Sequence, residues 1–227
     1  MKTPLKTAFL STVPVLTGYL VLGFGFGIIL HANGFGVGVA FAMSLLIYAG
    51  SMQYAAIGLM TGGASLLTLA VTTLMVNARH IFYGISMLGR YKDAGKAKPY
   101  LIFALTDETY SLVCQPPKEL TGKALRRYEL LVTLFDHAYW VTGSVLGAAA
   151  GALIPISSEG IDFALTALFL TVFTEQWLSA KDHSPALIGL GASAACLLLF
   201  GSGNFLIPAM LVIALLLCIR REESGDE

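Results

Sequence analysis

The chain has 227 residues, of which 56% are hydrophobic and only 12% are charged, about half the charged fraction of a typical soluble domain. Its 14 Lys and Arg residues balance 14 Asp and Glu residues, so the net charge is zero. These values exclude a basic nucleic-acid-binding surface and an acidic tail. They indicate an all-α integral membrane protein whose apolar surface faces lipid.

Hydrophobic stretches of spanning length follow one another along the sequence. A crossing needs about 20 apolar residues, because a helix rises about 1.5 Å per residue through a hydrocarbon core of ~30 Å. Lys2 and Lys6 precede the first stretch, as in a signal peptide, but no small-residue cleavage site follows, so we expect this helix to be retained. We expect about seven transmembrane helices. With the stretch at residues 100–114 counted as the fourth segment, the crossings are the first (7–30), second (36–59), third (66–88), fifth (128–154) and sixth (161–178) segments and, split in two at 201–204, residues 185–219.

Residues 100–114 form a shorter apolar stretch between two basic loops. Lys and Arg residues occur at 90–98 on one side and at 118–127 on the other, and short loops of this kind stay in the cytoplasm. The stretch between them therefore enters and leaves on the same side, as a re-entrant or short helix. Counting crossings from these loops predicts a multi-pass protein with its N-terminus outside and its C-terminus in the cytoplasm.

The two halves of the chain carry a weak repeat, in which Gln53–Tyr54 of the second crossing matches Gln176–Trp177 of the sixth. Many secondary transporters are built from inverted repeats and bind substrate near the midplane, where helices break. We therefore interpret the chain as a single transmembrane permease domain with an inverted repeat. Its parts are a first repeat (1–88), cytoplasmic loops with the re-entrant element (89–127), a second repeat (128–219) and a cytoplasmic tail (220–227).

The sequence contains no motif for a cofactor or a metal. Cys114, Cys196 and Cys218 lie far apart without CxxC or Cys/His spacing, which predicts neither a disulfide framework nor a zinc site. A Walker A motif is also missing, so coupling to ATP would need another protein, and ion coupling is favoured.

The third crossing contains polar side chains at a depth where an uncompensated charge costs about 3 kcal/mol or more. Asn77 and His80 are three residues apart and share a helix face, whereas Arg79 points elsewhere. Arg79 lies too deep to be only an interfacial anchor, which indicates charge pairing or substrate binding. The alternative is a structural arginine bound to backbone carbonyl groups. His80 is a candidate proton carrier or a structural histidine.

Carboxylates occur at three further places. Asp107 and Glu108 lie side by side in the 100–114 stretch, which must be buried in protein or line water. They are candidates for substrate binding or proton coupling; alternatively, they cap the helix of this element and pair with the basic loops. Asp136 and Glu175 lie in the fifth and sixth crossings. They are candidates for proton coupling, or they occupy interfacial positions in contact with water.

Small and polar residues lie near the middle of the second crossing, at Gly50, Ser51 and Gln53. Glycine there either permits a local break, which frees backbone groups for a ligand, or serves close helix packing. The fifth crossing has a small-residue face that suits either a partner helix or internal packing, formed by Gly143, Gly147 and Gly151.

Three runs, AGSMQYAAIGLM, VNARHIFYGISML and ALTDETYSL, resemble in order and spacing the hallmark runs of the AzlC-type branched-chain amino acid permeases. The resemblance covers essentially the whole chain. It implies the large subunit of a two-component exporter of valine, leucine, isoleucine and sometimes methionine in the cell inner membrane. The resemblance also implies a small hydrophobic membrane partner of the AzlD type.

The matching positions and the polar residues of the crossings give two sets of candidates. Because neither sign of charge is stable alone in a low-dielectric site, we expect Arg79 to lie near Asp107 or Glu108 in the empty protein. The substrate-binding candidates are Gly50, Ser51, Gln53, Asn77, Arg79, Asp107 and Glu108. The proton-coupling candidates are His80, Asp107, Glu108, Asp136 and Glu175.

Two other classes of function compete with a permease. An intramembrane protease would need a GxSG or HExxH motif, and the nearest run, FGSGN, has the wrong order. A non-transporting sensor or scaffold would not need a deep charge such as Arg79. We therefore expect a transporter without enzyme activity, whose ligands are an amino acid and membrane lipid rather than nucleic acid.

Overall fold

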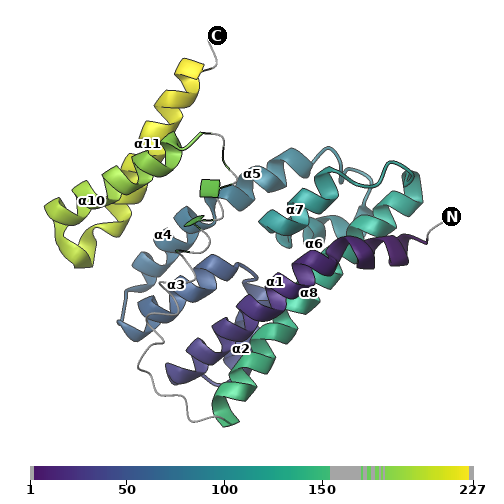
Figure 1. Cartoon of the computed structure of the whole chain (residues 1–227), viewed down its shortest axis with the longest axis horizontal. Coiled ribbons are helices and arrows are strands. Elements are labelled where there is room, and N and C mark those ends of the chain that lie inside the picture. Colours follow the sequence, from purple (N-terminus) through teal and green to yellow (C-terminus); the bar gives the residue numbers. More distant parts are fainter. Residues whose placement is uncertain are drawn as a thin grey trace. The chain divides into compact units, whose positions relative to one another are not determined.

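The computed structural model describes residues 3–153, 170, 173–174, 177–178, 180 and 182–224. In that part of the chain every regular element is a helix (Figure 1), as the composition predicts. The chain divides into two compact units, of which unit 1 comprises Met1–Leu69 and Val76–Glu159 and unit 2 comprises Ala70–Met75 and Gly160–Glu227. Most of the predicted sixth crossing, residues 161–178, lies outside the described residues.

The helices of the first 153 residues include two long ones and several short ones. Helix α8 begins at Gly122 within the basic loop, so it extends beyond the predicted crossing that starts at residue 128. In chain order the helices are α1 (Pro4–Ala32), α2 (Val37–Leu46), α3 (Gly50–Thr61), α4 (Leu66–Val76), α5 (Ala78–Met87), the 3₁₀ helix η1 (Gly95–Ala97), α6 (Lys98–Phe103), α7 (Asp107–Cys114) and α8 (Gly122–Leu153).

The long helices α1 and α8 lie side by side along their lengths (Figure 1). Their backbones touch at glycines, since a Cβ atom added to Gly143 would lie 2.9 Å from the Tyr19 carbonyl oxygen and one added to Gly147 would overlap the Phe24 backbone. Gly151, one turn further, also faces α1. This small-residue face of the fifth crossing therefore serves internal packing. It gives no support for a partner helix at these positions.

The predicted second crossing is broken into α2 and α3. The chain leaves the helical path at Ile47–Ala49, where Tyr48 has a positive φ of 46°, a backbone conformation that costs a bulky residue about 1 kcal/mol or more. The prediction of one continuous helix over 36–59 is thus wrong, and the alternative of a local break beside Gly50 is confirmed. Close packing also applies, since a Cβ atom on Gly50 would lie 3.0 Å from the Trp140 ring.

Two further apolar stretches are broken in the same way. Helices α4 and α5 meet at an angle of 48° around Asn77, so the predicted third crossing is a bent pair. The 100–114 stretch consists of α6 and α7, separated by Ala104–Thr106. Thr106 begins the second of these helices by accepting a hydrogen bond from the Thr109 backbone N–H at 3.2 Å. Whether this pair re-enters the membrane on one side stays a prediction.

Among the described residues, few helices are both long enough and apolar enough to qualify as a membrane span. By length and apolar composition α1 qualifies, and the α4–α5 pair also qualifies if it counts as one span. Helix α2 and the apolar parts of the last two helices, Ser184–Phe200 and Pro208–Leu217, are shorter. The count of about seven crossings therefore stays a prediction.

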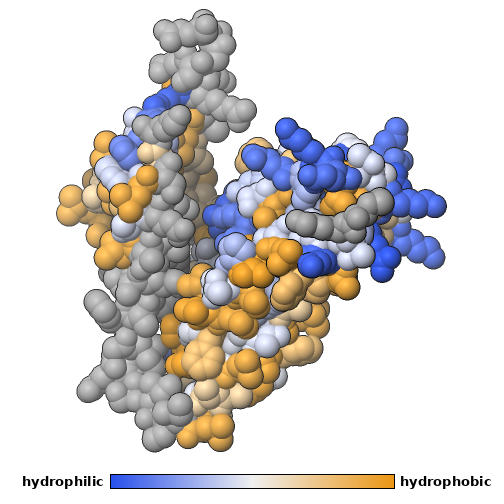
Figure 2. All heavy atoms as spheres, turned by 45° about the vertical axis from the view of Figure 1, so that its right-hand side comes forward, coloured by the Kyte–Doolittle hydropathy of each residue, from blue (hydrophilic) through white to orange (hydrophobic). Residues whose placement is uncertain are grey.

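The surface of unit 1 is strongly segregated. Figure 2 shows hydrophilic side chains gathered at one end of this unit and apolar side chains over the rest of its visible face. Along α1, the large side chains of Leu5, Leu10 and Val21 are 52%, 52% and 71% exposed. An apolar surface of this extent needs a cover, and lipid provides one.

Two helices, α10 (Ser184–Asn204) and α11 (Leu206–Ser224), pack on each other in unit 2. A kink at Gly201, with φ of 71°, and the helix end at Asn204 divide residues 185–219 at the predicted place. Before α10, Asp182 accepts hydrogen bonds from the Ser184 backbone N–H at 3.0 Å and from Arg220 at 2.7 Å. The Ser184 backbone N–H is the main cause of the lowered pKa of Asp182.

Candidate functional site

Three broken helices bring polar residues of their first turns together. Arg79, the second residue of α5, forms an ion pair with Asp107, the first residue of α7, at 2.5 Å between Nη1 and Oδ2. Its other terminal nitrogen donates a long hydrogen bond of 3.5 Å to Ser51, the second residue of α3. The expectation that Arg79 lies beside one of the two neighbouring carboxylates in the empty protein is confirmed, and the partner is Asp107.

The electrostatics of this cluster favour an anion. The first turn of a helix carries unpaired backbone N–H groups and the positive end of the helix dipole, and α3, α5 and α7 all begin here. A cation such as Arg79 is unfavourable at a helix N-terminus, so Asp107 compensates it. Among the described residues, Arg79 Nε and Asp107 Oδ1 have no hydrogen-bond partner. These two atoms are themselves buried, so part of the hydrogen-bonding capacity of each ion is unused in this structure.

The ion pair is accessible rather than sealed. The side chains of Arg79 and Asp107 are 39% and 37% exposed. One turn after each of them, Tyr83 on α5 and Tyr110 on α7 stack with ring centroids 4.5 Å apart. A pair of charges with an aromatic pair beside it can hold a molecule that carries both charges and an apolar group.

Three other substrate-binding candidates support the helices around the cluster. Gln53 is fully buried, donates to Ser44 Oγ at 3.2 Å and accepts from Trp140 Nε1 at 2.9 Å, so its amide links α2, α3 and α8. Asn77 forms the break between α4 and α5, and its carbonyl oxygen accepts from the His80 backbone N–H at 2.9 Å. Gly50 lets α3 begin against the Trp140 ring.

The proton-coupling candidates do not form a single group. The ring of His80 lies edge-on to Tyr83 at 6.0 Å on α5. Glu108 is exposed and accepts a hydrogen bond of 2.6 Å from Tyr19 of α1, not from Arg79. Asp136 is fully buried in α8, so the alternative of a water-exposed interfacial position is wrong for it. Glu175 lies outside the described residues.

Residues that the sequence did not single out connect two of these carboxylates. Tyr19, Thr106 and Thr109 bridge Glu108 to Asp136 by hydrogen bonds. A threonine directly before the carboxylates of TDET is a signal for a helix N-cap and could have placed the start of α7. Nothing in the sequence indicated that Tyr19, in an apolar helix, lies beside that start.

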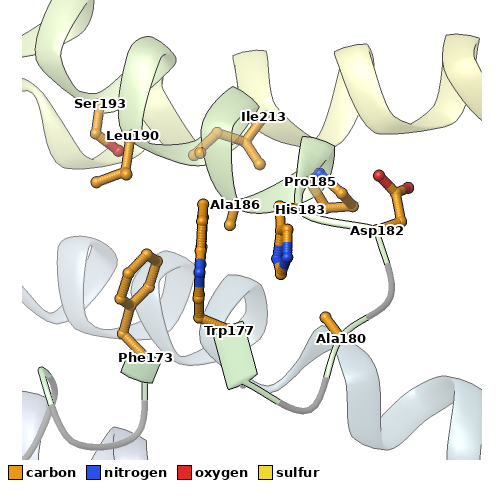
Figure 3. A pocket seen from close by; sticks show the side chains of 11 residues that line it. Phe173, Trp177, Ala180, Asp182, His183, Pro185, Ala186, Leu190, Ser193 and Ile213 are labelled. Carbon is orange, nitrogen blue, oxygen red and sulfur yellow. The ribbon is translucent and has the colours of Figure 1, made fainter. Parts of the chain in front are cut away.

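A separate hollow occurs within unit 2 (Figure 3). It is a cavity of about 490 Å³ between the segment around Trp177 and the helices α10 and α11. The Trp177 indole stacks on the His183 imidazole with ring centroids 4.1 Å apart. The centroid of the Phe173 ring lies 5.9 Å from that of the Trp177 indole. Most of its wall is aromatic or aliphatic, and none of the described candidate residues lines it.

Comparison with known proteins separates the functional classes. The sequence profile of a family described as AzlC protein matches residues 14–154. The branched-chain amino acid transport protein AzlC of Bacillus subtilis is 42% identical over 96% of this chain and 85% of its own length.

The chain belongs to the AzlC family. Two further relatives are named only as uncharacterized membrane proteins. The one from Haemophilus influenzae is 41% identical over 95% of this chain and 88% of its own length. The one from Helicobacter pylori is 38% identical over 96% of this chain and 95% of its own length. No solved structure matches the chain significantly. Membership of the AzlC family and the apolar helices make this chain a membrane protein with a transport-related role.

Proposed function

We propose that the chain is the permease subunit of a secondary transporter that exports branched-chain amino acids across the cell inner membrane. The observation that carries the proposal is the Arg79–Asp107 ion pair at the meeting point of three helix N-termini. The name of the Bacillus subtilis relative, a branched-chain amino acid transport protein, supports the substrate class. A small AzlD-type hydrophobic subunit is its partner, and ion movement drives net flux.

An amino acid zwitterion carries the same two charges as the ion pair. Its carboxylate takes Arg79, which offers a planar fork of donors, and the N–H groups of the helix starts add to the attraction. Its ammonium takes Asp107 or Glu108. Substrate binding thus exchanges one set of charge partners for another, and no charge is left unpaired in either state. A branched side chain packs against the stacked rings of Tyr83 and Tyr110.

The helix breaks suit such a carrier. Broken helices in transporters place backbone groups and helix ends at the substrate near the membrane midplane. In this proposal the chain spans the membrane about seven times, with the α6–α7 pair re-entrant from the cytoplasmic side. The N-terminus lies outside and the C-terminus in the cytoplasm.

Counterflow of labelled valine in proteoliposomes tests the function. The purified chain, reconstituted with an AzlD-type subunit, is preloaded with unlabelled valine, and uptake of external label is followed. We expect transient accumulation of label with valine, leucine and isoleucine but not with lysine or aspartate, whose side chains bring a further charge. A sensor, a scaffold or an enzyme would give no counterflow, and that result would overturn the proposal. Equal rates of valine counterflow with and without the AzlD-type subunit would contradict the part of the proposal that concerns a partner.

A further inference from the structure

A row of hydroxyl groups leads from the substrate site to a buried carboxylate. The Tyr19 hydroxyl lies 2.6 Å from both Glu108 Oε2 and Thr106 Oγ1, so its one hydrogen can be donated to either. The Thr106 hydroxyl donates to Thr109 Oγ1 at 3.1 Å, and the Thr109 hydroxyl donates to Asp136 Oδ2 at 2.8 Å. The Thr106 and Thr109 hydroxyl groups each accept from one neighbour and donate to the next. The Tyr19 hydroxyl group completes the row when Glu108 holds a proton, because it can then accept from Glu108 and donate to Thr106.

The two ends of this row have opposite environments. Glu108 is exposed and directly follows Asp107 of the ion pair, whereas Asp136 is fully buried. No Lys, Arg or His side chain forms an ion pair with Asp136 in the part of the chain that the structure describes, and its Oδ1 has no hydrogen-bond partner there. A carboxylate so placed is costly when charged and far less costly when it holds a proton. Asp136 is thus a proton acceptor at the end of a path.

Among the described groups around Asp136, no cation competes for this role. His137, the next residue of α8, already bonds the Ser44 carbonyl oxygen through Nε2 at 3.2 Å and the Tyr100 hydroxyl through Nδ1 at 3.0 Å, and a neutral ring satisfies both contacts. The titratable groups that interact electrostatically with Asp136 are Tyr48 of the α2–α3 break, Tyr100 of α6, Glu108 of α7 and Tyr128 of α8. All of them are acids.

We propose that Glu108, Tyr19, Thr106, Thr109 and Asp136 form a proton relay between the substrate site and the core of α8. Protonated Glu108 gives its proton to Tyr19 while Tyr19 gives its own to Thr106, Thr106 to Thr109, and Thr109 to Asp136 Oδ2. Glu108 becomes a carboxylate and Asp136 a neutral acid. Every hydroxyl group ends with one hydrogen, so the step needs no other reactant.

The relay deepens the proposed function, on which it rests, because it makes the proton the coupling ion. A substrate ammonium at Asp107 and Glu108 attracts the carboxylate form of Glu108 and so sends the proton to Asp136. Return of the proton to Glu108 neutralises that carboxylate and weakens the hold on the ammonium. Occupation of the substrate site and the position of the proton are therefore linked through Tyr19, Thr106 and Thr109.

Matched substitutions of the hydroxyl groups test the relay. Thr109→Val keeps the shape and removes the hydroxyl group, Thr109→Ser restores the hydroxyl group, and Tyr19→Phe keeps the ring that packs edge-on to Trp140 at 5.5 Å. Thr133→Val is the control, since it removes a fully buried hydroxyl group of α8 that donates to the Glu129 carbonyl oxygen at 2.9 Å and lies outside both the substrate site and the relay. Each variant is reconstituted with the AzlD-type subunit, and two quantities are measured: valine counterflow, and net valine flux driven by an imposed pH gradient.

We expect Thr109→Val and Tyr19→Phe to keep wild-type counterflow and to lose gradient-driven flux by about tenfold or more, because proton transfer through a positioned group typically contributes at least that much. Thr109→Ser and Thr133→Val should keep both. Unchanged gradient-driven flux in Thr109→Val and Tyr19→Phe would overturn the relay alone. So would loss of counterflow in both, because the hydroxyl groups would then support the fold or the substrate site. Absence of counterflow in the wild type would overturn the proposed function and the relay with it.

Discussion

Replacement of Arg79 by lysine separates the shape of this side chain from its charge. Arginine contacts Asp107 through one terminal nitrogen and Ser51 through the other. It can release Asp107 to a substrate ammonium and take a carboxylate with two parallel hydrogen bonds. Lysine has a single nitrogen, so Arg79→Lys keeps the ion pair but cannot hold a carboxylate in this bidentate way.

The size of the effect follows from the contact that is lost. A hydrogen bond to a charged group contributes about 1.5–3 kcal/mol. Since about 1.4 kcal/mol corresponds to a tenfold change in affinity, the loss of one of the two bonds weakens valine binding by roughly 10- to 100-fold. The long contact to Ser51 adds little, and Ser51→Ala should weaken binding by much less.

The assay is the valine concentration that gives half-maximal counterflow, corrected for the amount of each variant in the membrane. We expect this concentration to rise in Arg79→Lys while leucine and isoleucine shift in parallel, because all three share the carboxylate. A half-saturation concentration unchanged from the wild type would refute the assignment of Arg79 to the substrate carboxylate.

Two further predictions concern the fold. Gly147→Ala places a Cβ atom on the Phe24 backbone, so we expect a loss of about 1–3 kcal/mol in stability, measured as a lower melting temperature in detergent. Gly18→Ala, with open space around it on α1, is the control and should leave the melting temperature unchanged. Equal melting temperatures of the two variants would contradict the contact. In a variant without Cys114, Cys196 and Cys218, a single cysteine at Gly36 should react with an impermeant reagent added to intact cells and one at Lys96 should not; outside labelling of Lys96 would contradict the predicted orientation.

The proximity of Arg79 and Asp107 could be predicted because it follows from charge alone. Two opposite charges in apolar segments have no low-energy state apart from each other. The burial of Asp136 could not be predicted, because it depends on α7 packing across α8 and on a Thr109 contact made 27 residues away in the chain. Tyr19 and Thr106, which form a hydrogen bond, are 87 residues apart in the sequence. No local sequence pattern predicts such a contact.

Most of the helix breaks could not be predicted from the sequence. Proline is missing from LLIYAGSMQ, and the only local hint is Gly50. The break occurs at Tyr48, whose positive φ is held by tertiary contacts, since its ring is buried and stacks on His137 at 4.1 Å. Apolar residues continue on both sides of such a break. Counting apolar residues therefore gave continuous crossings where the structure has pairs of short helices.

The glycine contacts between α1 and α8 also determine which parts of unit 1 can change shape. Sliding either helix by one residue would drive a side chain into the opposing backbone, because Gly23, Gly27, Gly143 and Gly147 leave no spare room. Helices α1 and α8 therefore keep a fixed position relative to each other. The short helices of the broken segments are joined instead by corners at residues 47–49, 77 and 104–106. In the proposed transporter, a rearrangement that opens the site first to one side of the membrane and then to the other would therefore bend the chain at those corners, while α1 and α8 keep their packing.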